Sequence, residues 1–379
     1  MTAYDLLTRL LGLQKIHCVD DARALAKRRL PAMVFDYVDG AAGDGRAERH
    51  NRDQLQAMRL RTRVLRDVEA RSLKTSLLGK DYDLPFGIAP MGFGNLVAPG
   101  ADTMLATAAA RHNMPMGLST AATTALEDIA QASQNQAWFQ LYYTKNRDTG
   151  DMLIGRAEQA GYDTLVFTVD VPEVGRRPRE LQHNFTLPFR PNIAQAIDCA
   201  LHPVWSLKTV TKGPPTLANF GGKYPEFDRK ASRAGGDWDY LSYLRDRWKG
   251  KLVVKGVLDV DDAVQLKTTG VDAIQISSHG GRQLQSAPYP IDALRAIRQA
   301  VGPDMTLLYD SGIRSGEDII KAYANGADFV FLGRPFLYAI AADGERGLHT
   351  VIEVLGTETS TALAMIGATS MSDLGDCLA

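Results

Sequence analysis

A histidine and an arginine three positions apart, His279 and Arg282, are the residues of this chain best suited to chemistry. They lie in residues 277–284, Ser-Ser-His-Gly-Gly-Arg-Gln-Leu, directly after the apolar run 272–276, which predicts a buried strand. A neutral imidazole accepts a proton near pH 7, and a guanidinium holds a carboxylate by two parallel hydrogen bonds. The two glycines let the backbone bend and a flat ligand approach. A base beside a carboxylate clamp suits an α-hydroxy acid, although a histidine at a strand end is equally often structural.

The elements that must position these residues follow a regular pattern. Short apolar runs, read as strands, occupy residues 86–89, 115–118, 137–141, 164–169, 252–254, 273–276, 306–309 and 329–332. Segments of helical spacing lie between them, at 101–111, 126–134, 149–160, 260–267, 291–299 and 316–325. The alternation predicts an α/β fold, a closed (β/α)8 TIM barrel, with an open doubly wound sheet as the alternative. The barrel is favoured because polar residues and glycines recur at the carboxyl ends of all eight strands.

We expect residues 1–379 to form a single barrel domain with an N-terminal helical extension over residues 1–75. Within it, Asp20-Asp21 is a candidate cap for a helix over 22–29. Residues 30–40 predict a second helix, with Pro31 in its first turn. Residues 46–74 are rich in arginine, and we expect them to form a solvated surface.

A long segment after the fourth strand, residues 176–245, interrupts the alternation. Its residues 176–236 contain ten Lys or Arg against four Asp or Glu, a net charge of +6. The same stretch carries the apolar residues Phe185, Leu187, Phe189, Ile193, Ile197, Leu201, Val204, Trp205 and Leu207. Basic charge mixed with apolar side chains suits a membrane interface, while an active-site lid or a subunit contact explains the composition equally well.

The bulk composition excludes several classes of protein. The net charge of −1 over 379 residues gives no sign of nucleic-acid binding. The three cysteines, Cys18, Cys199 and Cys377, are widely spaced and offer neither metal-binding spacing nor a disulfide framework. No apolar run approaches the roughly 20 residues of a membrane-spanning helix, and residues 1–13 lack the pattern of a signal peptide. A cytoplasmic protein without a bound metal is therefore expected.

The last two predicted strands are followed by a candidate phosphate site. Residues 310–316, Asp-Ser-Gly-Ile-Arg-Ser-Gly, open a helix, and Gly333-Arg334 follow the eighth strand. Phosphate commonly binds at these two loops of a barrel, beside a helix N-terminus. This signal indicates a phosphate-bearing ligand without saying which one. The dinucleotide-binding pattern G-x-G-x-x-G is absent near the N-terminus, which argues against a nicotinamide enzyme.

Residues 277–284 resemble the signature Ser-x-His-Gly-Gly-Arg-Gln-Leu of the flavin mononucleotide (FMN)-dependent α-hydroxy acid oxidases and dehydrogenases, with Ser278 where that family usually has Asn. The resemblance extends from Tyr37 to Arg334 and is greatest to the bacterial membrane-associated lactate and mandelate dehydrogenases. It implies FMN as cofactor and the oxidation of an L-2-hydroxy acid, mandelate-like or lactate-like, to the 2-oxo acid.

The resemblance also implies the substrate-side roles. Arg282 and Tyr37 hold the substrate carboxylate, with Arg177 as a second arginine nearby. His279 is the base, and Asp170 orients its ring and stabilises its protonated form. Tyr142 contacts the substrate hydroxyl. Whether His279 first removes the hydroxyl proton or the α-carbon proton stays open.

The implied flavin site uses residues at the strand ends. Lys255 directly follows a buried strand, where an unpaired charge is costly; in the family this lysine faces the N1–C2 carbonyl edge of the ring and stabilises its reduced form. The other implied cofactor-binding residues are Pro90, Met91, Gly92, Ser119, Gln140, Thr168, Ser277, Asp310, Ser311, Gly312, Arg314, Gly333 and Arg334. Gly92 and Ala121 leave room for a bulky substrate side chain.

The resemblance finally suggests partners. A membrane quinone is the favoured electron acceptor, with the enzyme peripheral on the inner face of the cell membrane and residues 176–245 as the anchoring segment. Oxygen, giving hydrogen peroxide, is the alternative acceptor. The family is commonly tetrameric, so a homotetramer is expected. From another class, a flavin-free phosphate-binding isomerase would share the barrel and the phosphate loops.

Overall fold

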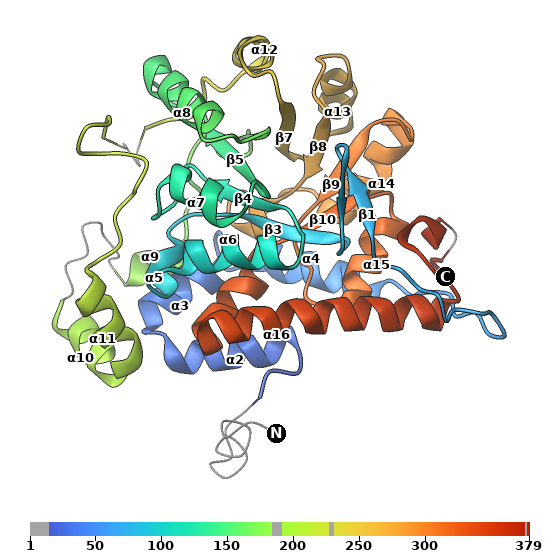
Figure 1. The fold of residues 1–379 in the computed structure, drawn as a ribbon, viewed down its shortest axis with the longest axis horizontal. Helices are drawn as coiled ribbons and strands as arrows, with labels where there is room; N and C mark the ends of the chain where they lie inside the picture. The colour runs from blue at the N-terminus through green and yellow to red at the C-terminus, as the bar shows by residue number, and fades with distance from the viewer. Residues whose placement is uncertain (1–14, 184–191, 227–230, 376) are drawn as a thin grey trace.

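Eight parallel strands form a closed barrel at the centre of the molecule (Figure 1). The computed structural model describes residues 15–183, 192–226, 231–375 and 377–379. The barrel strands are β3 (Phe86–Met91), β4 (Met116–Ser119), β5 (Ala137–Tyr142), β6 (Thr164–Thr168), β7 (Lys251–Val257), β8 (Ala273–Ile276), β9 (Thr306–Tyr309) and β10 (Phe329–Leu332). Because β10 pairs with both β9 and β3, the sheet has no free edge. The predicted TIM barrel is confirmed, and the open-sheet alternative is wrong.

Helices surround the barrel and connect its strands (Figure 1). They are α6 (Ala101–Arg111), α7 (Leu126–Ala132), α8 (Arg147–Gln159), α12 (Trp238–Arg247), α13 (Val260–Lys267), α14 (Pro290–Val301), α15 (Gly316–Ala324) and α16 (Arg334–Ile366). A short helix α5 (Gly94–Val97) and two 3-10 turns, η1 (His279–Gly281) and η2 (Met371–Leu374), complete this set. The sequence reasoning did not anticipate α12 or the long α16, which bends at Asp343 and Gly344.

Two apolar layers hold the barrel together. One lies between the strands and the helices. The other fills the barrel interior and includes Trp138, Phe329 and Phe331. A hairpin of β1 (Thr75–Leu77) and β2 (Lys80–Tyr82) adds Leu77 and Tyr82 to this inner layer. Since Trp138 and Phe329 lie near the starts of their strands, the hairpin covers the amino-terminal end and leaves the carboxyl ends for a site.

The N-terminal extension contains α2 (Val19–Arg29), α3 (Ala32–Asp39) and α4 (Arg46–Ala57). Helix α2 begins earlier than predicted, so Asp20 and Asp21 lie in its first turn rather than at its cap. Pro31 is likewise the cap residue of α3 and not part of its first turn. Helix α4 is more than a solvated surface, because its inner side buries residues such as Asn51 and Leu55 against the barrel.

The segment after β6 forms three helices, α9 (Pro178–Gln182), α10 (Ile193–Leu201) and α11 (Pro203–Lys212), before α12 returns the chain to the barrel. Helices α10 and α11 form a pair that projects beside α3 and α5 (Figure 1). Trp205 is buried and its indole N–H donates to the Leu96 carbonyl, so it packs inward and does not belong to the exposed apolar residues of this segment. Phe185, Leu187 and Phe189 lie outside the described residues.

The other predicted apolar residues of this segment are exposed. They are Ile193, Ile197, Leu201, Val204 and Leu207, and Val210 joins them. Among the described helices, none is both long enough and apolar enough to cross a bilayer.

Candidate active site

His279 lies at the carboxyl end of β8, hydrogen-bonded to Asp170 from the end of β6. The His279 Nδ1 atom is 3.0 Å from Asp170 Oδ1. Burial is the largest influence on the Asp170 carboxyl and raises its pKa, but His279 and Lys255 together lower it below its ordinary value. Burial lowers the pKa of His279 despite the neighbouring Asp170. An ionised Asp170 can only accept, so Nδ1 carries the proton and Nε2 is left as the basic atom.

A strained turn places this imidazole. His279, Gly280 and Gly281 have φ angles of 55°, 62° and 75°, in the left-handed region that a histidine rarely adopts. A Cβ atom on Gly280 would come within 2.6 Å of Arg334 Nη1, and one on Gly281 within 2.5 Å of the Glu48 nitrogen. The Ser278 hydroxyl accepts hydrogen bonds from the Gly281 N–H and from Asn51 Nδ2. Ser278 therefore secures the turn, and helix α4 supports it from behind.

Arg282 and Tyr37 meet at one wall of the pocket. Arg282 Nη1 donates to the Tyr37 and Gly40 carbonyl oxygens at 2.8 and 2.9 Å. Its guanidinium carbon lies 5.3 Å from the Tyr37 ring centre, and the Tyr37 hydroxyl donates to the Gly92 carbonyl. Arg282 Nη2 donates to the carboxylate of Glu180 on α9 at 2.9 Å.

A second arginine, Arg177, adjoins this wall. Its Nε donates to the Arg282 carbonyl and its Nη2 to Gln283. Burial and the charge of Arg282 lower the pKa of Arg177 to about 10. Tyr142 also lines the pocket, and burial raises the pKa of its phenol to about 12, so the hydroxyl keeps its proton.

Lys255 is buried at the end of β7 and forms an ion pair there. Its ammonium lies 3.1 Å from Asp310 Oδ2 and donates to the Ser277 hydroxyl at 2.7 Å. Burial, the largest influence, lowers the pKa of Lys255, but Asp310 and Asp170 together raise it above its ordinary value. Ser277 also donates to Asp310 and accepts from the His279 N–H. A charged lysine is thus fixed to the same loop as the candidate base.

Two further arginines gather at the loops after β9 and β10. Arg334 donates to the carbonyls of Val38, Gly280 and Gly40, and across the described residues no carboxylate forms an ion pair with it. Burial lowers the pKa of Arg334 to about 10. Arg314 pairs with Glu48 at 3.0 Å, yet its buried Nε finds no hydrogen-bond partner within the described chain. This end of the pocket therefore presents positive charge that its own carboxylates only partly balance.

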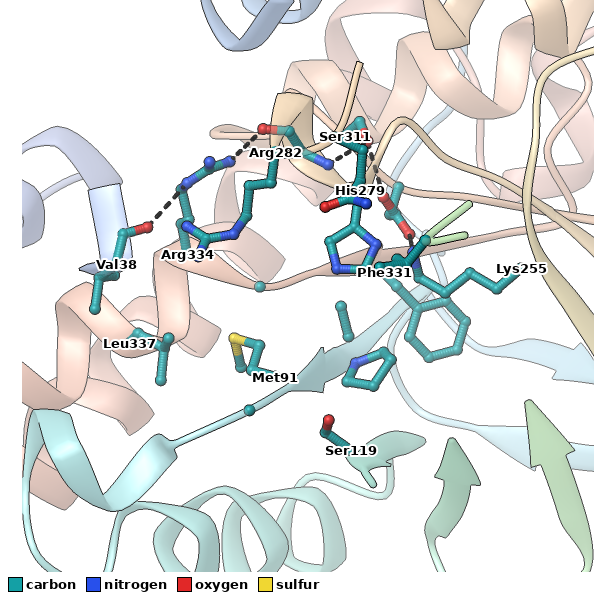
Figure 2. A pocket seen from close by; sticks show the side chains of 18 of the residues that line it. Val38, Met91, Ser119, Lys255, His279, Arg282, Ser311, Phe331, Arg334 and Leu337 are labelled. Atoms are coloured by element: carbon teal, nitrogen blue, oxygen red, sulfur yellow. Dashed lines mark hydrogen bonds and ion pairs between the residues drawn. The ribbon is translucent and has the colours of Figure 1, made fainter. Parts of the chain in front are cut away.

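The predicted site residues converge on one cavity at the carboxyl ends of the strands. All of them line it except four, Gln140, Thr168, Asp170 and Ser277. Figure 2 shows Arg282 and Arg334, which share the Gly40 carbonyl, beside His279, with Met91 and Leu337 projecting from other walls. Gln140 lies behind the wall and donates to the Thr168 hydroxyl at 3.0 Å. Gln140 and Thr168 are not among the residues that line the cavity, and their contact with the cofactor stays a prediction.

Comparisons with known proteins identify the family of this chain. The family described as FMN-dependent dehydrogenase matches residues 26–378. The chain belongs to this family. It is 39% identical over 368 residues to (S)-mandelate dehydrogenase of Pseudomonas putida, covering 95% of this chain and 93% of that protein. It is 36% identical over 371 residues to an L-lactate dehydrogenase of Pseudomonas syringae pv. syringae, covering 95% and 97%.

Two solved structures are similar to this chain over nearly its full length. A crystal structure described as that of the monotopic membrane protein (S)-mandelate dehydrogenase matches with a TM-score of 0.90 and 38% identity, covering 97% of this chain and 100% of that one. A mandelate oxidase variant with (S)-mandelic acid matches with a TM-score of 0.83 and 31% identity, covering 96% and 98%. The FMN-dependent dehydrogenase predicted from the sequence is confirmed, and the flavin-free isomerase alternative is wrong.

The residues present fit FMN, the cofactor of this family. A phosphate group would supply the acceptor that the buried Arg314 Nε lacks, and a counter-charge for Arg334. Apolar residues such as Met91 and Leu337, together with the paired Lys255, offer a surface with one cationic edge.

Sequence reasoning missed several residues of the site. Asn51 and Glu48 reach it from α4, Glu180 from α9, and Arg233 from the end of the insertion, where its guanidinium lies 5.2 Å from the Tyr142 ring centre. Only tertiary contacts reveal them. Gln275 was detectable, because it alternates with Ser277 along β8, and it donates to Asp310 at 2.7 Å.

Proposed function

We propose that this FMN-dependent dehydrogenase oxidises an L-2-hydroxy monocarboxylic acid to the 2-oxo acid. The observation that carries the proposal is the hydrogen bond from His279 Nδ1 to Asp170, which orients the His279 ring in the cavity that Arg282 and Arg177 also line. A neutral base and a cationic clamp in one cavity suit a substrate that carries a carboxylate beside a hydroxyl. The similarity to mandelate and lactate dehydrogenases supports this substrate class.

The roles of the substrate-side residues follow from their contacts. Arg282, with Arg177 and Tyr37 beside it, binds the carboxylate. Tyr142 keeps its proton and hydrogen-bonds the substrate hydroxyl. His279 accepts a proton from the substrate at Nε2, and Asp170 stabilises the imidazolium that forms, because an ionised carboxylate 3.0 Å from Nδ1 favours the charged ring.

The cofactor-side residues are assigned by the same reasoning. Bound FMN supplies the two-electron acceptor of the reaction. Arg314 and Arg334, with the backbone of Asp310, Ser311, Gly312 and Gly333, would hold its phosphate. Pro90, Met91, Gly92 and Ser119 would line the flavin ring, and Lys255 would stabilise negative charge at the ring's polar edge. Gln140, Thr168 and Ser277 would complete the contacts with the cofactor.

The substrate side chain would lie against small and apolar residues. Gly92 and Ala121 are adjacent, since a Cβ on Gly92 would come within 3.2 Å of the Ala121 Cβ. Phe93 and Val174 line the same cavity. These residues favour a bulky or aromatic group, as in mandelate, with lactate as the second candidate.

Substitution of the base tests the proposal. His279→Ala should retain bound flavin, because no phosphate-site residue is changed, while the rate of flavin reduction by the 2-hydroxy acid falls at least about 100-fold. Stopped-flow measurement of flavin bleaching under anaerobic conditions gives this rate. Near-normal flavin reduction in the variant would refute the assignment of His279.

We propose further that the electrons pass to a membrane quinone, with α10 and α11 resting on the membrane. The exposed apolar residues of these helices and the exposed Lys208 and Lys212 support a peripheral position. Turnover with a soluble quinone analogue should greatly exceed the rate of peroxide formation. Peroxide produced at the full rate of turnover would instead identify an oxidase. The homotetramer stays a prediction.

A further inference from the structure

Glu180 places a carboxylate between the two arginines that face the substrate. Its Oε1 accepts a hydrogen bond from Arg282 Nη2 at 2.9 Å and lies 3.5 Å from Arg177 Nη1. The three side chains are similarly enclosed, with 14–15% of their surface exposed. Glu180 does not itself line the cavity. We call Arg177, Arg282 and Glu180 the carboxylate clamp.

The net charge of the clamp follows from its three members, two arginines and one glutamate. Burial and, after it, the neighbouring charge of Arg282 lower the pKa of Arg177, and Glu180 offsets one of the two positive charges. The other charged groups nearby balance one another, since Lys255 pairs with Asp310, and the ionised Asp170 beside the neutral His279 is offset by Arg233, which also lines the cavity. The clamp therefore presents a single net positive charge to the cavity.

Glu180 also fixes the direction of the Arg282 fork. The Nη1 hydrogens are directed to two carbonyl oxygens and one Nη2 hydrogen to Glu180. Within the described chain, the Nε hydrogen and the second Nη2 hydrogen are left for a ligand. Arg179, the residue before Glu180 on α9, forms ion pairs with Asp36 and Asp39 of α3. These ion pairs hold α9 in place and keep Glu180 next to Arg282.

We propose that Glu180 is a specificity-determining positioning residue, which limits the clamp to one net positive charge and thereby matches it to a monocarboxylate over a dicarboxylate. This inference rests on the proposed function, because it assumes that the clamp binds the substrate carboxylate.

A matched pair of probes isolates the charge effect. Oxamate and oxalate have nearly the same shape and differ by one negative charge. Replacing Glu180 with Gln removes one negative charge beside the clamp while keeping an oxygen that can accept from Arg282. The electrostatic gain scales with the charge of the anion, whereas any loss of orientation affects both probes alike. The ratio of the oxamate Kd to the oxalate Kd should therefore rise at least about tenfold.

The measurement is titration of the FMN-loaded enzyme with each probe, followed by the change in the flavin absorption spectrum. Glu180→Asp keeps the charge and should hold the ratio within about threefold of the wild type. Glu345→Gln, an exposed site on α16, makes the same charge change outside the cavity and should leave the ratio unaltered. If Glu180→Gln does not retain flavin, the test uses the ratio of the oxamate Kd to the oxalate Kd in Glu180→Asp. A tenfold change of this ratio from the wild-type value overturns the inference, and an unchanged ratio supports it.

The outcomes separate the two proposals. If the wild-type flavin is reduced by 2-hydroxy acids and both probes bind, but Glu180→Gln leaves their ratio unchanged, Glu180 has no role in charge matching and only this inference fails. If neither probe perturbs the wild-type spectrum and no 2-hydroxy acid reduces the flavin, the proposed function itself fails and takes the inference with it.

Discussion

At the scale of single residues, Lys255 and Asp310 form an ion pair that burial makes sensitive to loss of either partner. Both side chains are less than 10% exposed, and they lie 3.1 Å apart. Lys255→Met would leave the Asp310 carboxylate buried without a cation, and we expect a loss of about 3–5 kcal/mol of unfolding free energy. Lys255→Met combined with Asp310→Asn should recover part of this stability without recovering flavin reduction. Urea unfolding at saturating FMN measures the first effect, and a single variant as stable as the wild type would contradict the pairing.

The His279–Asp170 hydrogen bond should influence how kcat/KM depends on pH. Because burial lowers the pKa of His279, the neutral base persists at neutral pH, and kcat/KM should fall only as pH drops below the ordinary value of 6.5. Asp170→Asn removes the charge that favours the imidazolium, so the acidic limb should move to lower pH. The plateau should also fall roughly 100-fold or more. A pH profile of kcat/KM for both enzymes tests this, and an acidic limb that moves to higher pH would exclude the proposed role of Asp170.

Most site residues could be predicted because they directly follow apolar strands, and parallel strands in a barrel deliver their carboxyl ends to one face. Asn51 could not, since it bonds Ser278 from 227 positions away and looks like any polar residue on a helix. Glu180 could not be predicted either, because of the composition of the sequence around it. It lies in a basic stretch whose composition suggested a surface, and only the fold shows that its carboxylate lies between two arginines and offsets one of their charges.

At the scale of elements, helices α6 and α16 are joined by a histidine pair that should respond to pH. His112 Nε2 lies 2.8 Å from His349 Nδ1, with Arg111 and Glu345 beside His349 and Glu353 near His112. Burial and the charge of His349 lower the pKa of His112 below 6.5. The unfolded chain then binds a proton more readily than the folded one, so stability falls as pH decreases through 6.5 toward the lowered value.

His112→Gln should reduce this pH dependence, because it removes the group that titrates. Thermal unfolding midpoints at about pH 7.5 and about pH 5.5 measure the difference, and the variant should lose less stability between them than the wild type. Lys267 on α13 provides a control, since Lys267→Gln substitutes a polar side chain on a different helix and leaves the histidine pair in place. An equal loss in wild type and His112→Gln would show that other groups control acid stability.

The barrel strands were predictable because buried parallel strands read as short continuous apolar runs. The long α16 was not, since its interior contains the Asp343-Gly344 bend, which interrupts the periodic pattern. The β1–β2 hairpin was also missed. Its strands have three residues each, too short for a pattern, and packing against Trp138 and Phe329 stabilises them.

At the scale of the whole molecule, charge is distributed unevenly. The chain carries a net charge of −1, whereas residues 176–236 carry +6, so the rest of the molecule is acidic. Of the basic residues in that stretch, Lys208 and Lys212 are exposed on α11, where an anionic bilayer would attract them. Because α10 and α11 project beside α3 and α5, this attraction would draw the pair of helices toward the membrane (Figure 1).

The exposed apolar residues of α10 and α11 should contribute to membrane binding. Leu201 and Leu207 are 74% and 67% exposed, and burying each in lipid would contribute about 1.5–3 kcal/mol. The double substitution Leu201→Glu and Leu207→Glu should therefore weaken binding to anionic vesicles at least about 100-fold while kcat with a soluble acceptor is kept. High salt should weaken wild-type binding only in part, because Lys208 and Lys212 contribute the electrostatic share and the apolar side chains the rest.

Val264→Glu, an exposed apolar position on α13, is the matched control for vesicle sedimentation. Equal binding by the double variant and the wild type would show that another surface meets the membrane, or that none does.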